Sequence, residues 1–214
     1  MSVSTWTRNS LRTLLIATTN RDKVREIRAI LERSPVTLLS LQDFPRIPEP
    51  DETGTTFQEN ARLKAMYYAA AIATAAPDRQ PWCTVAEDSG LVIDALDGEP
   101  GVHSARFRRP DATYPERFAE ISRRLAERPA APRTARFVCA VALVNAGTLV
   151  YETTGLVEGE IAERARGDRG FGYDPIFYYP PYRRTLGEAT DEEKQRVAHR
   201  GQAFRQLATW LRNK

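Results

Sequence analysis

Short apolar runs alternate with helical patterns along the first part of the chain. Residues 13–19 and 36–41 are apolar runs rich in branched side chains, a composition typical of buried strands. Between them, apolar residues recur every three or four positions over residues 21–34, which predicts an amphipathic helix. A Thr-x-x-Glu capping box at residues 56–59 opens a second helix, which we expect to end near residue 75.

The middle of the chain combines further strands with turn signals. Residues 83–86 form a short apolar run, and we expect this strand to end at the polar sequence 87–90. Residues 135–162 predict a hairpin around residues 145–147, followed by a separate third strand after Gly155.

Two more capping boxes predict helices later in the chain, at residues 113–116 and 190–193. Between them lies a glycine-rich aromatic loop at residues 167–175, and the last helical stretch is expected to break near His199. No period of 20–50 residues recurs, so a repeat protein is excluded. The order of the elements predicts an α/β fold with one long mixed β-sheet flanked by helices.

We expect one two-lobed domain over residues 13–214, preceded by a flexible tail at residues 1–12. Of the 214 residues, 42% are hydrophobic and 28% are charged, which is typical of globular proteins and too apolar for a disordered chain. Cys83 and Cys139 have neither metal-ligand spacing nor a disulfide framework. No apolar stretch approaches the roughly 20 residues that span a bilayer. We therefore expect a cytoplasmic protein without a membrane span or a secretory signal.

The basic residues are strongly biased toward arginine. The chain has a net charge of +3 from 31 basic and 28 acidic residues, which is too balanced to predict nucleic-acid binding. Lysine occurs only at positions 23, 64, 194 and 214. A compact ammonium group suits sites that the planar guanidinium does not fit, although four lysines can also remain by chance.

Two polar clusters in the first part of the chain are suited to phosphate. Thr18, Thr19, Asn20 and Lys23 lie at the first strand-to-helix turn, where backbone N–H groups bind anions; the alternative is a polar helix cap. An acidic pair at residues 51–52 precedes the helix that carries Lys64, and such a pair can also be a simple complement to the helix dipole.

Two further clusters offer metal ligands and base contacts. The sequence Glu87-Asp88-Ser89-Gly90 suits Mg²⁺ and water activation, or else a turn in which Asp and Ser bond their own backbone. Residues 171–175, with Lys194, His199 and Arg200, can stack on a base and hold its carbonyl oxygen, or form an aromatic core corner beside a charged helix. No nucleophile elbow, HExxH zinc motif or zinc-ligand spacing is present.

Five segments carry a resemblance to one family. ATTNRDKVREI, ETGTTFQENARLKA, AEDSGLVIDALDGEPGVHSARF, GFGYDPIF and EEKQRVAHRGQA occur in this order over nearly the whole chain. They resemble the inosine/xanthosine triphosphate pyrophosphatases, the Ham1-like pyrophosphatases of non-standard purine nucleoside triphosphates. Three of the four lysines fall inside these segments.

The resemblance implies hydrolysis of ITP, dITP or XTP to the nucleoside monophosphate and pyrophosphate with Mg²⁺, in an elongated homodimeric α/β protein. It implies that Asp88 is the general base and a metal-linked carboxylate, that Lys64 acts beside it, and that Asp51 or Glu52 supports the metal. Substrate binding is implied for Thr18, Thr19, Asn20, Arg21, Asp22, Lys23, Ser89, Phe171, Gly172, Tyr173, Asp174, Lys194, His199 and Arg200.

The chain departs from the family pattern at Thr19, where glycine or serine is usual, at Glu87, where aspartate is common, and at Ala198, where serine often stands. Base selection is expected to rest on His199 and Arg200, which donate to the 6-oxo group of a purine while Phe171 stacks on the ring. Two alternatives stay open: a pyrophosphatase for other modified triphosphates, and a nucleotide-binding or nucleic-acid-binding protein without hydrolytic activity.

Overall fold

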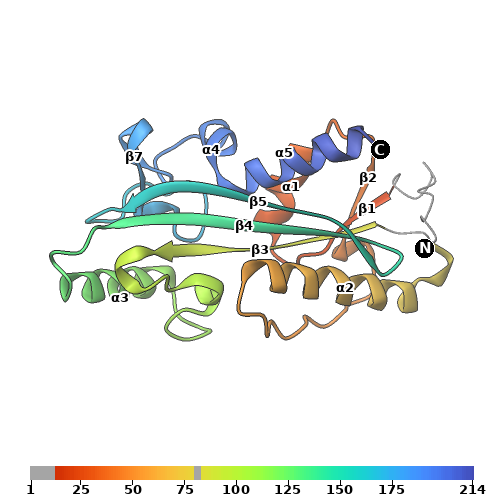
Figure 1. Cartoon of the computed structure of the whole chain (residues 1–214), viewed down its shortest axis with the longest axis horizontal. Coiled ribbons are helices and arrows are strands. Elements are labelled where there is room, and N and C mark those ends of the chain that lie inside the picture. The colour runs from red at the N-terminus through yellow and green to blue at the C-terminus, as the bar shows by residue number, and fades with distance from the viewer. Residues whose placement is uncertain (1–12, 80–82) are drawn as a thin grey trace. The chain divides into compact units, whose positions relative to one another are not determined.

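A computed structural model describes residues 13–79 and 83–214 (Figure 1). The tail predicted for residues 1–12 lies outside the described residues. The chain divides into two compact units. Unit 1 contains the residues up to Asp88 together with residues 140–154 and 203–214, and unit 2 contains residues 89–139 and 155–202.

The strands form one seven-stranded sheet in the order β2-β1-β3-β4-β5-β6-β7. β1 pairs in parallel with β2 and β3, whereas β6 pairs antiparallel with β5 and β7. The predicted α/β class with a mixed sheet is therefore confirmed. The strands are β1 (Thr13–Ile16), β2 (Thr37–Ser40), β3 (Cys83–Ile93), β4 (Thr134–Asn145), β5 (Thr148–Ile161), β6 (Phe177–Tyr179) and β7 (Arg184–Thr185).

In the part of the chain that the structure describes, five α-helices accompany the sheet: α1 (Arg21–Leu31), α2 (Phe57–Ala75), α3 (Tyr114–Ala126), α4 (Asp191–Val197) and α5 (His199–Arg212). All three predicted capping boxes are present, at the starts of α2, α3 and α4. The expected break near His199 is confirmed, because Ala198 has an extended backbone between α4 and α5. Within the described residues, no helix combines the length and the apolar character needed to cross a bilayer.

Unit 1 is built on the parallel strands β2, β1 and the first part of β3. Figure 1 shows α1 and α2 on opposite sides of these strands. Leu15 of β1 and Ile72 of α2 are fully buried and pack with Leu39 and Phe44, so α2 is held by its apolar contacts with the sheet. This contact fixes the C-terminal part of α2 against β1, the strand after which the polar residues of the first cluster follow.

Unit 2 has its own apolar core. Ile121 and Leu125 of α3 pack with Ile93, Phe137 and other buried residues of β3 to β6. Phe177 belongs to the same core and its ring lies 4.5 Å from that of Phe137. This core supports the loop at residues 167–175, which directly precedes the β6 region.

Two predicted strand boundaries are wrong. The strand that begins at Cys83 does not end at residues 87–90 but continues to Ile93. Its partner β1 ends first, since Ile16 pairs with Val85, and so Glu87 and Asp88 lie within a strand just beyond the end of its neighbour. The strand expected after Gly155 is part of β5, which continues through that glycine to Ile161 and alternates exposed and buried residues from Thr154 onward.

Candidate active site

The first strand-to-helix turn places Lys23 beside an acidic residue of β3. Asn20 caps α1, because its side-chain oxygen accepts the N–H groups of Asp22 and Lys23 at 2.9 and 3.2 Å. The Lys23 ammonium lies 2.7 Å from the Glu87 carboxylate, whose side chain is only 1% exposed. The turn thus brings one lysine to the acidic segment of β3.

Lys64 forms the centre of a second ion cluster. Its Nζ atom lies 2.7 Å from Glu52 Oε1 and 2.7 Å from Asp88 Oδ1. The structure therefore brings together three of the predicted residues, from the loop before α2, from α2 itself and from β3. We call Lys23, Glu52, Lys64, Glu87 and Asp88 the acid–lysine cluster; all five belong to unit 1.

Burial shapes the charges of this cluster. Burial raises the pKa of Asp88, while Lys64 opposes this rise and the carboxylates of Glu52 and Glu87 reinforce it. Burial also disfavours the charged form of Lys64, but the three carboxylates together outweigh it, so the pKa of Lys64 is raised. Asp88 is therefore a stronger base than an exposed aspartate, and Lys64 stays protonated near neutral pH.

Asn60, which the sequence analysis did not place in the site, ties this cluster together. It is fully buried, and its Oδ1 accepts the Gly54 N–H at 2.8 Å. This bond fixes the orientation of the amide, so its Nδ2 faces Asp88 Oδ2, at 3.3 Å. A Cβ on Gly54 would lie 2.7 Å from Asn60 Oδ1. The signal in the sequence is the spacing of Asn60 one helical turn before Lys64.

Other residues predicted for the triphosphate side lie apart from these ion pairs. Arg21 and Asp51 are exposed, and Asp22 pairs with Arg25. The Thr19 hydroxyl donates to Glu49, and the Thr18 hydroxyl accepts the Asn20 N–H at 3.3 Å. Of the acidic pair at residues 51–52, it is Glu52 that reaches Lys64.

A magnesium ion fits the acid–lysine cluster by its donors. Within residues 13–79 and 83–214, no three His, Cys, Asp or Glu side chains already form a metal-binding group. However, Glu52 and Asp88 each place one oxygen 2.7 Å from the same ammonium group. Two carboxylates that share one cation can share another, and their hard oxygens are the ligands that Mg²⁺ prefers.

In unit 2, the aromatic loop is held by a buried ion pair. Lys194 Nζ lies 2.7 Å from Asp174 Oδ2, and both side chains are almost fully buried. Asp174 also accepts the Phe171 N–H at 2.8 Å, and the Lys194 ammonium lies 4.5 Å from the centre of the Phe171 ring. At Gly170, where φ is +71°, a Cβ would lie 2.2 Å from Asp174 Oδ2, so only glycine fits.

The remaining predicted residues of unit 2 surround the same loop. Arg200 donates to the Ser89 hydroxyl at 2.9 Å, and its guanidinium lies 5.4 Å from the centre of the Phe171 ring. His199 is buried and stacks on Phe137 at 4.8 Å. Tyr173 is buried as well, its hydroxyl donates to the Ser104 carbonyl at 2.8 Å, and burial raises its pKa. We call Phe171, Asp174, Lys194 and Arg200 the aromatic cluster.

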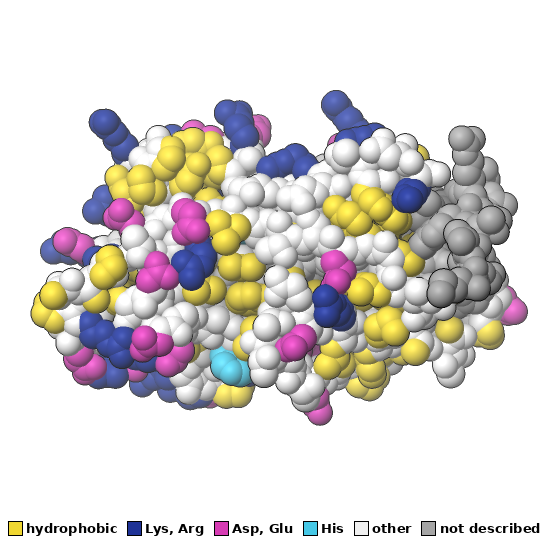
Figure 2. All heavy atoms as spheres, in the orientation of Figure 1, with side chains coloured by type: hydrophobic (Ala, Val, Ile, Leu, Met, Phe, Trp, Pro, Cys, Tyr) yellow, Lys and Arg dark blue, Asp and Glu magenta, His cyan; other side chains and the backbone are white. Residues whose placement is uncertain are grey.

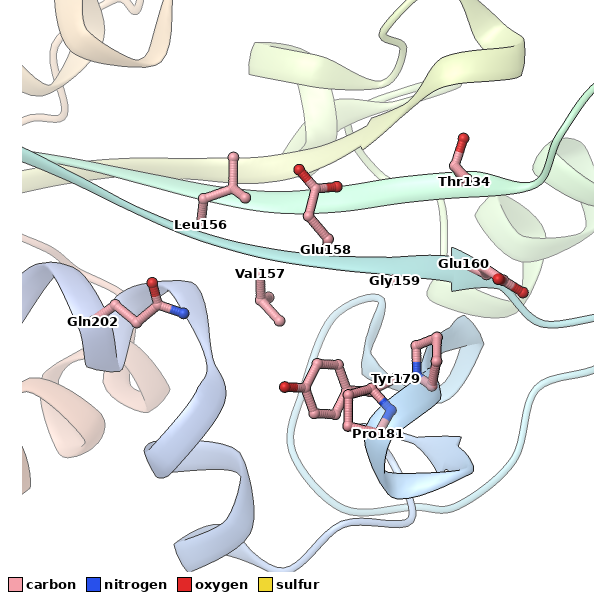
Figure 3. A pocket seen from close by; sticks show the side chains of 10 residues that line it. Thr134, Leu156, Val157, Glu158, Gly159, Glu160, Tyr179, Pro181 and Gln202 are labelled. Carbon is pink, nitrogen blue, oxygen red and sulfur yellow. The ribbon is translucent and has the colours of Figure 1, made fainter.

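Unit 2 also contains a cavity of about 490 Å³ beside β5. Figure 3 shows Val157, Tyr179 and Gln202 around it. None of the residues predicted for the site lines this cavity, so its presence does not bear on the two clusters.

The comparisons with known proteins assign the chain to a family. The family model of the Ham1 family matches residues 14–210, and the chain therefore belongs to the Ham1 family. A protein of Halalkalibacterium halodurans named dITP/XTP pyrophosphatase is 43% identical over 92% of this chain and 97% of its own length. One of Geobacillus kaustophilus with the same name is 45% identical over 92% and 93%. The structure of a HAM1 protein from Coxiella burnetii superposes with a TM-score of 0.83, at 36% identity, over 94% of this chain and 99% of that one.

Proposed function

We propose that the chain hydrolyses non-standard purine nucleoside triphosphates, namely ITP, dITP and XTP, to the nucleoside monophosphate and pyrophosphate. One observation carries this proposal. In a chain of the Ham1 family, the Lys64 ammonium lies 2.7 Å from a carboxylate oxygen of Glu52 and 2.7 Å from one of Asp88. The relatives named dITP/XTP pyrophosphatase support it at more than 40% identity over nine-tenths of the chain.

In the proposed reaction, the acid–lysine cluster handles the polyphosphate. Glu52 and Asp88 would hold Mg²⁺, which would neutralise charge at the phosphates and acidify water. Lys23 and Lys64 add fixed positive charge for a substrate that carries about four negative charges. Asp88 accepts the proton of the attacking water.

In unit 2, the aromatic cluster and His199 are proposed to select the base. Phe171 stacks on the purine, and His199 and Arg200 donate hydrogen bonds to its 6-oxo group. An adenine would turn its amino donors toward these donors and leave them unpaired, which costs a few kcal/mol. The pair of Asp174 and Lys194 supports Phe171, since it binds the Phe171 backbone and ring.

We further propose that the protein works in the cytoplasm as a homodimer and does not bind nucleic acid. On the face shown in Figure 2, basic and acidic side chains are interspersed, whereas nucleic-acid sites need a continuous basic surface. Light scattering of the purified protein tests the dimer. Retention of the protein on DNA at moderate salt would contradict the proposal that it does not bind nucleic acid.

The decisive experiment compares dITP, XTP, GTP and ATP as substrates of the purified protein with Mg²⁺. We expect pyrophosphate as the product from dITP and XTP, with much slower turnover of ATP, and no product without a divalent metal. Release of orthophosphate, or equal rates with ATP and dITP, would refute the proposal. Heat protection by dITP without any product would indicate a binding protein instead.

A further inference from the structure

A buried arginine of unit 2 forms no ion pair with any carboxylate of the described residues. Arg117 belongs to the first turns of α3 and is only 4% exposed. Its Nε atom is buried without a hydrogen-bond partner. An isolated buried charge is strongly disfavoured. The contacts that Arg117 does make must therefore offset the cost of burying its charge.

These contacts are aromatic and neutral. The Arg117 guanidinium lies 4.9 Å from the centre of the Tyr114 ring, which is within the range of a cation–π interaction. It also lies close enough to the Tyr173 hydroxyl to oppose the rise that burial causes in the pKa of that group, and it donates a hydrogen bond of 3.4 Å to the Pro110 carbonyl. We call Arg117, Tyr114 and Tyr173 the arginine socket.

Tyr173 joins the arginine socket to the loop that carries Phe171. Its hydroxyl has one proton, which it donates to the Ser104 carbonyl at 2.8 Å, so the hydroxyl oxygen keeps its lone pairs for the nearby Arg117. Its ring packs edge-on against Tyr114, with centroids 5.4 Å apart. The Tyr173 side chain is therefore fixed at both its ring and its hydroxyl.

The loop thus has two anchors on either side of Gly172. Asp174 holds the Phe171 N–H and pairs with Lys194, and Tyr173 enters the arginine socket. Gly172 has a φ of +68°, and a Cβ there would lie 3.5 Å from the Tyr114 hydroxyl. The backbone between the two anchors is short, so a change at Tyr173 must move Phe171.

We propose that Arg117 is a positioning residue for purine binding, which fixes the Phe171 loop through Tyr173 and Tyr114. The inference rests on the proposed function, because it takes Phe171 as the residue that stacks on the base. A planar guanidinium can stack on Tyr114 and lie beside the Tyr173 hydroxyl at the same time, and an ammonium is less suited to both contacts. Arginine is therefore required at this position rather than positive charge alone.

The test measures base binding and phosphate binding separately, by calorimetry with deoxyinosine monophosphate and with pyrophosphate. In Arg117→Met we expect affinity for the monophosphate to fall about tenfold and affinity for pyrophosphate to stay within about twofold. The KM for dITP should rise about tenfold, with kcat nearly unchanged. Arg117→Lys should resemble Arg117→Met. The matched control is Arg123→Met, on the exposed side of the same helix, which should change neither affinity.

A second variant covers the case in which Arg117→Met does not fold. Tyr173→Phe keeps the ring and removes only the hydroxyl, and we expect about a fivefold loss of monophosphate affinity. Because the two residues act as one unit, the double variant should be no worse than the poorer single one. Wild-type affinity in both single variants, or additive losses, would overturn the inference. If the wild-type protein neither binds the monophosphate nor cleaves dITP, it is the proposed function that fails.

Discussion

The acid–lysine cluster of unit 1 and the aromatic cluster of unit 2 each contain a lysine–aspartate pair at 2.7 Å, but the two pairs differ in charge balance. In unit 2, Lys194 and Asp174 form a one-to-one pair whose side chains are 6% and 3% exposed. In unit 1, Lys64 lies between Asp88 and Glu52, and the Glu52 side chain is 23% exposed. The acid–lysine cluster as a whole has three carboxylates against two ammonium groups.

This difference explains how the same two residue types can serve different purposes. The Lys194 pair is neutral and covered by the Phe171 ring, so it has no remaining capacity for a metal and acts as a support. The acid–lysine cluster has one more carboxylate than ammonium groups, and its Glu52 side chain is partly exposed to solvent. An excess of buried negative charge attracts a cation, which is what a polyphosphate-cleaving site requires.

The largest expected effect follows from removing the charge of Asp88. In Asp88→Asn we expect kcat for dITP to fall about a thousandfold, because the proton acceptor and a metal ligand are both lost. Nucleotide binding should persist, since Lys23, Lys64 and the aromatic cluster remain. Pyrophosphate release and calorimetry measure the two quantities. Turnover at the wild-type rate would contradict the assignment of Asp88.

The Lys194 pair should respond in stability rather than in chemistry. Lys194→Met leaves Asp174 buried without its partner, so we expect the free energy of unfolding to fall by about 3 kcal/mol. Urea denaturation measures this change, and Lys214→Met at the C-terminus is the matched control. A loss below about 0.5 kcal/mol would mean that this pair does not support the loop.

Asn60→Asp sharpens the comparison by adding charge to the acid–lysine cluster. The new carboxylate still accepts the Gly54 N–H but turns an oxygen toward Asp88 in place of an amide donor. We expect kcat to fall about 30-fold, because the position and charge of Asp88 are both disturbed. Gln58→Glu makes the same change at an exposed position of α2 and should leave kcat within about twofold. Equal effects in the two variants would rule out a role for the Asn60 amide.

Gly170→Ala tests how tightly the unit 2 pair is enclosed. The added Cβ would lie 2.2 Å from Asp174 Oδ2 at a φ of +71°, so we expect a destabilisation of about 1–2 kcal/mol. Thermal unfolding compares this variant with Gly147→Ala, where φ is also positive but no atom lies within 4 Å of the new Cβ. Similar losses in both would indicate backbone strain alone.

The smallest expected effect is on the pH dependence of stability, through Asp88 of unit 1. The pKa of Asp88 is raised above its unfolded value of 3.8, so the folded protein binds this proton more tightly than the unfolded chain. The stabilisation from its proton is complete below pH 3.8 and is lost as the pH rises through the folded pKa. Asp88→Asn should thus be more stable than the wild type at pH 7, and its advantage should shrink on acidification. Urea titrations at several pH values measure this difference, and a constant difference would contradict it.

Local patterns predicted the elements well, and long-range contacts decided the details of the site. The three capping boxes are complete within four residues, and each begins a helix as expected. The end of the strand at Cys83 was wrong because it depends on where its neighbour β1 stops. The same is true of the acidic pair at residues 51–52, since only folding shows that Glu52 is the residue that reaches Lys64.

The sequence by itself determined the helices, the α/β class and the residue types available for chemistry. These depend on the spacing of residues close together in the chain and on short motifs that resemble those of a known family. The tertiary structure alone decided which charges meet. It joined Lys64 to Asp88 and Lys194 to Asp174, placed Asn60 between a loop and a strand, and buried Arg117 under Tyr114. The physical reason is that the energy of a buried charge depends on neighbours distant in sequence.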